Sequence, residues 1–169
     1  MKNTMTNGII QKMMTIALVA VIVLSFAACP TEADDDDNSG KLTVTGISEY
    51  DGKWIFAMGN SKTDETMIYA AANITISPPA VTGVKISGGK AELNVWEVRN
   101  GELFNFDKTG QYGVVLYIIK KATFTEDDFT AIFDKSDFSN VAGGAGETVN
   151  FTAGVGTLTS PSISPPPGP

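Results

Sequence analysis

The chain of 169 residues has no histidine, one cysteine and one arginine. Histidine is the most common general base and metal ligand and titrates near neutral pH, so its absence removes the usual basis of a catalytic or metal site. The single cysteine, Cys29, has no intramolecular partner, so the fold depends on its apolar core. Without a Ser-His or Cys-His pair, we expect no enzyme, no cofactor and no bound metal.

Basic residues are also scarce. The chain carries 12 basic and 19 acidic residues, and residues 1–28 hold two of the lysines and no acid. Removing residues 1–28 therefore leaves a net charge of −9. Nucleic acids and anionic headgroups bind clustered lysine and arginine, so we expect no nucleic-acid partner.

The cysteine ends an apolar run near the N-terminus. Lys2 and Lys12 precede the run, which begins near Thr15 and closes with Leu24-Ser25-Phe26-Ala27-Ala28-Cys29. A basic start, a short apolar core and small residues before a cleavage point predict an export signal. Residues 16–28 number only 13, whereas about 20 apolar residues are needed to cross a bilayer.

These residues resemble the lipobox of bacterial lipoproteins, in which a leucine-like residue stands three positions before the cysteine. Ala27, Ala28 and Cys29 fit, and Phe26 replaces the usual leucine, a relaxed form known from spirochaetal lipoproteins. The resemblance implies that Cys29 carries acyl chains such as palmitate. It also implies a membrane anchor in the bacterial cell envelope, on the periplasmic or surface face of the outer membrane. The alternatives are a free cysteine in an uncleaved helix and a secretory signal without lipid.

Two polar segments flank the remaining chain. Asp34 to Asp37 repel one another, so they predict an extended tether rather than a calcium loop, which needs spaced oxygen ligands and a turn glycine. Residues 160–169 contain five prolines and predict a disordered, polyproline-like tail. The predicted division is a signal peptide over 1–28, a tether over 29–40, a folded domain over 41–159 and a tail over 160–169.

The folded domain reads as a series of strands. Leu42 and Val44 alternate with threonines, which predicts one buried and one wet face. Lys53–Met58 is apolar on both faces, and Tyr112–Ile119 is the most hydrophobic run, so both are expected in the middle of a sheet. About eight strands with one short helix predict an all-β domain, either a single antiparallel β-barrel or a β-sandwich.

One segment predicts a helix and another a loop. Thr125 offers a capping hydroxyl, acids follow in the first turn, and Phe129 and Ile132 share one face. We expect this helix to plug a barrel end or cover a sheet edge. Ser139–Gly146 holds three glycines and is expected to be a flexible loop.

Two hairpins follow one scheme. Gly88-Gly89 lies between alternating runs and supplies the positive φ angles of a two-residue turn, and Ala153-Gly154 repeats the pattern. The repeat fits a duplication with halves of about 41–99 and 100–159, and it fits two ordinary hairpins with the same turn chemistry equally well.

Two family resemblances concern this domain. Gly52-Lys53-Trp54 resembles the Gly-x-Trp signature of lipocalins, eight-stranded barrels that carry small apolar ligands; the lipocalin arginine of the last strand has no equivalent, since Arg99 lies in mid-chain. Leu42–Ile47, the same Gly-Lys-Trp turn and Gly88–Trp96 are similar to small spirochaetal lipoproteins with a β-rich domain. The second resemblance implies location and fold rather than activity.

Aromatic residues are the candidate binding residues. Trp54, Trp96 and Tyr112 are proposed to contact a ligand, because aromatic faces at a barrel mouth suit sugars or peptides; the alternative is that they are core. Two hypotheses follow: a non-enzymatic binding module with a protein or glycan partner, and a carrier of a small apolar ligand. A filled barrel favours the module, and an internal cavity of about 300 Å³ or more favours the carrier.

Overall fold

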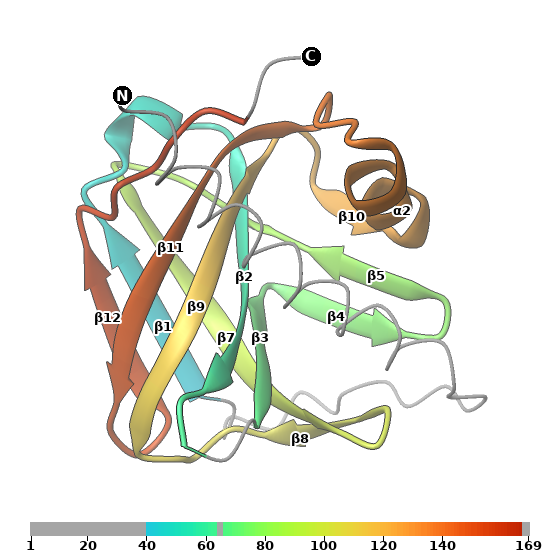
Figure 1. The fold of residues 1–169 in the computed structure, drawn as a ribbon. Coiled ribbons are helices and arrows are strands. Elements are labelled where there is room, and N and C mark those ends of the chain that lie inside the picture. The colour runs from blue at the N-terminus through green and yellow to red at the C-terminus, as the bar shows by residue number, and fades with distance from the viewer. Residues whose placement is uncertain (1–39, 64–65, 167–169) are drawn as a thin grey trace, which may run out of the picture.

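The computed structural model describes residues 40–63 and 66–166 (Figure 1). The predicted signal peptide, Cys29 and the acidic run lie outside the described residues. The strands are β1 (Gly40–Thr45), β2 (Trp54–Ser61), β3 (Met67–Ala71), β4 (Asn73–Ile76), β5 (Pro79–Thr82), β6 (Val84–Lys85), β7 (Lys90–Arg99), β8 (Glu102–Asn105), β9 (Gly110–Ile119), β10 (Thr123–Thr125), β11 (Val141–Phe151) and β12 (Val155–Thr159). A 3₁₀ turn η1 (Ser48–Tyr50) and one α-helix, α2 (Glu126–Lys135), complete the described elements, which confirms the all-β prediction.

The large sheet curls into a nearly closed barrel. Its strand order is β11-β9-β2-β3-β7-β1-β12, with β6 also pairing with β2 and β8 with β7. A tight hairpin joins β11 to β12, so the two ends of the sheet come together (Figure 1). The pairs are antiparallel with one exception, because β1 runs parallel to β12. Bringing the two ends together protects the edge strands β11 and β12. The barrel is not a simple meander, because most neighbouring strands do not follow one another in sequence.

The barrel interior holds the first core. On β1 the apolar residues face inward and the threonines outward, as the alternation predicted. Each such buried aliphatic side chain contributes about 1.5–3 kcal/mol. The interior residues are Leu42, Val44, Ile47, Ile55, Ala57, Ile68, Ala70, Ile86, Ala91, Leu93, Val95, Phe106, Tyr112, Val114, Leu116, Ile118, Ala145, Val149, Phe151 and Leu158.

A second core lies on the outer face of the barrel. The small sheet β10-β5-β4 and helix α2 cover this face (Figure 1). Its buried residues are Phe56, Met58, Tyr69, Ala71, Ile74, Ile76, Val81, Trp96, Val98, Ile119, Phe124, Phe129, Ile132 and Val141. The helix therefore packs on the outside of the barrel and does not plug its end.

The two cores explain the strands that are apolar on both faces. On β2, Ile55 and Ala57 enter the barrel, whereas Phe56 and Met58 enter the second core. β2 pairs with β3 and β9, and β9 pairs with β2 and β11, so both predicted central strands are central.

The glycine-rich segment is a strand rather than the predicted loop. β11 begins at Val141, and its glycines pair with β9 after a register shift between Val141 and Gly143. A Cβ atom at Gly143 would lie 2.7 Å from Cγ2 of Ile163. Gly143 therefore permits the close approach of Ile163 to the strand.

The start of the predicted tail takes part in that packing. Gly144 and Ser164 exchange two backbone hydrogen bonds of 2.9 Å, and Ile163 packs against the barrel core. The expectation of disorder from Ser160 onward is therefore wrong for residues 160–164. Prolines disfavour a regular strand because they have no backbone N–H, but the bridge to Gly144 uses only the N–H and the carbonyl of Ser164.

Both predicted hairpin turns are present. Gly88 and Gly89 have φ angles of 59° and 69°, and Ala153 and Gly154 have φ angles of 46° and 78°. Positive φ at both central residues matches the twist of an antiparallel hairpin. No helix among the described residues has the length and apolarity to cross a membrane.

Candidate functional site

The structure does not bring the three candidate binding aromatics together. Trp54 and Trp96 belong to the second core, where Trp96 is 6% exposed and Trp54 is half-buried. The Lys85 ammonium lies 5.9 Å from the Trp54 ring centroid. Tyr112 instead faces the barrel interior, so the sheet separates it from both tryptophans.

Tyr112 is part of an aromatic cluster that fills one end of the barrel. Its ring makes edge contacts with Phe106 and Phe151 at centroid distances of 5.3 and 5.5 Å, and Phe106 and Phe151 are 5.0 Å apart. Edge-to-face pairs of this kind add about 0.5–1.5 kcal/mol beyond the buried area. Tyr112 is only 3% exposed, so its position is that of a core residue.

Sequence reasoning missed a hairpin in this region. The first part of residues 100–110 forms β8, which pairs with the end of β7. Asn100 and Gly101 have φ angles of 51° and 79° and make the turn. An Asn-Gly pair is the strongest short hairpin signal, so the sequence did contain this information.

The β7–β8 hairpin brings together a carboxylate, a guanidinium and a ring. Glu97 lies opposite Phe104 in register and two residues from Arg99, so the three side chains share one face. Arg99 Nε lies 2.8 Å from Glu97 Oε1, and the Arg99 guanidinium lies 4.4 Å from the Phe104 ring centroid. The Glu97 side chain is 4% exposed and that of Arg99 is 53% exposed.

The carboxylate of Glu97 is incompletely paired. Its second oxygen, Oε2, is buried and has no hydrogen-bond partner within the part of the chain that the structure describes. A buried carboxylate oxygen without a donor is unfavourable by about 1–3 kcal/mol or more. Glu97 is therefore the most unusual polar group in the barrel.

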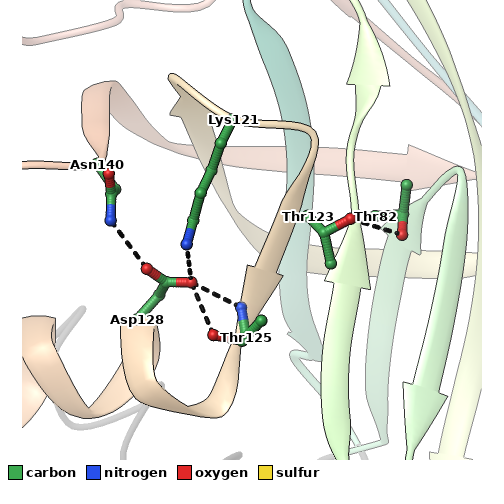
Figure 2. Close-up of polar contacts among 6 residues, drawn as sticks. All are labelled: Thr82, Lys121, Thr123, Thr125, Asp128 and Asn140. Atoms are coloured by element: carbon green, nitrogen blue, oxygen red, sulfur yellow. Dashed lines mark hydrogen bonds and ion pairs between the residues drawn. The ribbon is translucent and has the colours of Figure 1, made fainter.

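Asp128 offers a contrast, because its carboxylate is fully paired (Figure 2). It accepts hydrogen bonds from the backbone N–H of Thr125 at 2.8 Å, from the Thr125 hydroxyl at 2.9 Å and from Asn140 Nδ2 at 2.9 Å, and Lys121 Nζ lies 2.5 Å away. Burial acts to raise the pKa of Asp128, but the bonds from Lys121 and Thr125 outweigh it and lower that pKa.

The Asp128 cluster has a structural explanation. Thr125 and Asp128 form a capping box at the start of α2. Reciprocal bonds of this kind satisfy the free N–H groups of a first helical turn. The adjacent threonines Thr82 and Thr123 tie β5 to β10 with hydroxyls 3.4 Å apart (Figure 2). The acids of residues 126–128 thus act as helix N-terminal charges, as their position predicted.

A second unpaired polar atom lies on the other side of the sheet. Tyr69 is 1% exposed in the second core, and its hydroxyl has no hydrogen-bond partner among the described residues. Burial, with a smaller contribution from Tyr117, raises the pKa of Tyr69 well above its usual value, so the phenol stays protonated.

These atoms do not form a recognisable catalytic arrangement. Tyr69 is paired in register with Trp96, so these two side chains lie on the same face of the sheet. Glu97 follows Trp96 on the strand, so its side chain points to the opposite face. Within residues 40–63 and 66–166, no three Asp, Glu, His or Cys side chains are placed to hold a metal ion. Comparison with protein-family models, with curated proteins and with solved structures finds no match.

Proposed function

We propose that this chain is an acylated lipoprotein of a bacterial cell envelope whose β domain is a non-enzymatic binding module. The lipobox-like residues Phe26 to Cys29, after a basic start and an apolar run, support the anchor. A protein or a glycan outside the membrane is the partner class that this architecture serves best.

The filled interior of the barrel is the observation that favours a module over a carrier. Leu42, Leu93 and Leu116 enter from different strands and are 0% exposed. The cluster of Phe106, Tyr112 and Phe151 occupies one end. A carrier of small apolar ligands needs a cavity of about 300 Å³ or more, which these side chains would have to vacate.

The anchor is tested by metabolic labelling with an alkyne analogue of palmitate. The full chain, expressed in a Gram-negative host, should be labelled and should sediment with membranes, and Cys29→Ser should lose both properties because the thiol is the acylated group. A matched control carries Cys29→Ser with Ser39→Cys, which places the thiol outside the lipobox. Labelling of either variant at the level of the parent chain would contradict the proposal.

The choice between module and carrier is tested by native mass spectrometry of the full chain released from detergent. We expect the acylated mass alone, because the interior positions are occupied. A small-molecule adduct that is reproducible and is lost on denaturing extraction would overturn the module in favour of the carrier.

A further inference from the structure

Two large hydrophobic side chains are exposed among the described residues, and both lie at one end of the barrel. Phe104 on β8 is 36% exposed, and Val155 at the start of β12 is 54% exposed. Single exposed apolar residues are ordinary on protein surfaces. Their position together is informative, because Figure 1 shows β8 and the β11–β12 turn at the same end of the barrel.

The described chain begins at this same end. Lys41, which is paired with Val155 in register, donates its backbone N–H to Gly154 O at 2.9 Å. A Cβ atom at Gly40 would lie 2.6 Å from Phe106 O, so the first described residue is held against the loop that follows β8. We call this region, made of Gly40, residues 99–110 and residues 151–155, the tether end.

The chain between Cys29 and Gly40 joins the folded domain at this end of the barrel. Eleven residues lead from Cys29 to Gly40, so even a fully extended chain reaches only about 40 Å. If Cys29 is acylated, as proposed above, the tether end is the part of the domain that is held nearest the lipid.

The charges at the tether end suit a neutral lipid surface. Residues 99–110 hold two basic residues, Arg99 and Lys108, and two acidic residues, Glu102 and Asp107, so this segment has no net charge of its own. The Arg99 guanidinium stacks on the Phe104 ring, which places a cation beside the exposed aromatic. Aromatic rings and long cationic side chains favour the headgroup region of a bilayer, where ring and charge are both accommodated.

We propose that the tether end rests on a zwitterionic phospholipid surface, with Phe104 and Val155 in the headgroup region. This inference depends on the proposed acylation of Cys29. The opposite end of the barrel, which carries η1 and the Gly88-Gly89 turn, then points away from the membrane and is presented to a partner.

The single cysteine makes a direct depth measurement practical. Because Cys29 would be acylated, an introduced cysteine is the only free thiol, and it can carry an environment-sensitive fluorophore. Probes are placed at Val155→Cys and at Glu102→Cys, which keeps Phe104 intact. The matched control is Lys90→Cys, because Lys90 holds the equivalent position in the opposite hairpin turn and, like Val155, is more than half exposed.

The full acylated chains are inserted into vesicles of phosphatidylcholine and phosphatidylethanolamine with nitroxide-labelled headgroups. We expect quenching at positions 155 and 102 to exceed that at position 90 at least twofold, and we expect no increase when phosphatidylglycerol is added. Flotation of each sample with the vesicles is measured separately and reports the anchor.

The outcomes separate the two proposals. Flotation with equal quenching at all three positions would overturn the orientation and leave the acyl anchor standing. Quenching that appears only with phosphatidylglycerol would also overturn it, since the contact would then be electrostatic. Chains that fail to float would refute the anchor and the orientation together.

Discussion

Removal of the Arg99 guanidinium should destabilise the fold more than its exposure suggests. Arg99 is half exposed, but its partner Glu97 is 3% exposed and has no other cation within hydrogen-bond distance in the described chain. Breaking a fully buried pair by removing one partner costs about 3–5 kcal/mol. Water can replace part of the exposed guanidinium, so we expect Arg99→Ala to lose about 2 kcal/mol of unfolding free energy.

The reasoning predicts that Glu97→Gln rescues this loss. The amide removes the buried charge, and its NH2 takes the place of an oxygen that is already unpaired, so Glu97→Gln alone should stay within about 1 kcal/mol of the parent. The double variant should resemble Glu97→Gln, which gives a coupling energy of about 2 kcal/mol. Equilibrium urea unfolding, followed by the fluorescence of Trp54 and Trp96 in the second core, measures all four proteins.

A matched control lies on the same strand. Lys90 pairs with Glu92 at 3.6 Å, and both side chains are more than half exposed, so Lys90→Ala should cost less than about 0.5 kcal/mol. If Arg99→Ala destabilised the fold no more than Lys90→Ala does, the proposed role of the Arg99–Glu97 pair in stability would be refuted. Purely additive effects of Arg99→Ala and Glu97→Gln would refute it equally, because the two side chains would then be independent.

Three further predictions concern single groups. Tyr69→Phe should be neutral or stabilising by up to about 1 kcal/mol in urea unfolding, because the hydroxyl has no partner among the described residues; a loss above 1 kcal/mol would show that it has one. Ala153→Gly should raise the thermal midpoint, with a gain of about 0.5–1 kcal/mol, because Ala153 has a φ of 46°. The lowered pKa of Asp128 means that its stabilisation is complete above the unfolded pKa of about 4 and is lost as pH falls through the folded pKa. Asp128→Asn should therefore make stability less dependent on pH below 4 in acid titrations monitored by circular dichroism, and an unchanged acid limb would contradict this.

Periodicity was sufficient to predict most strands, because burial on one face leaves a period of two in the sequence. It also marked Lys53–Met58 as central, since both faces are apolar. Periodicity did not show what covers the second face, because the covering elements β4, β5 and α2 are separate in sequence. The helix was found from its cap, yet its position depends on contacts of Phe129 and Ile132 that no local pattern contains.

The errors arose where composition was given more weight than packing. Gly143 and Gly144 were interpreted as flexible, whereas both are strand residues: a Cβ at Gly143 would crowd Ile163, and Gly144 makes two backbone hydrogen bonds with Ser164. Glu97 gave no sequence signal, because a charged residue in a strand ordinarily faces water. Its burial follows from the Asn-Gly turn that folds β8 back along β7, and this turn was overlooked.

The two cores also limit where a partner can bind. Each central strand uses both of its faces for packing, so an internal ligand would have to displace side chains from one core or the other. The outer face of β1 and β12 is not covered in this way: it presents paired threonines, Thr43 beside Thr157 and Thr45 beside Thr159. Such a face offers hydroxyl donors and acceptors but little apolar area, so binding there would depend on hydrogen bonds and shape. The binding module proposed above would therefore present a polar outer surface, which is better matched to a glycan or a hydrophilic protein surface than to an apolar small molecule.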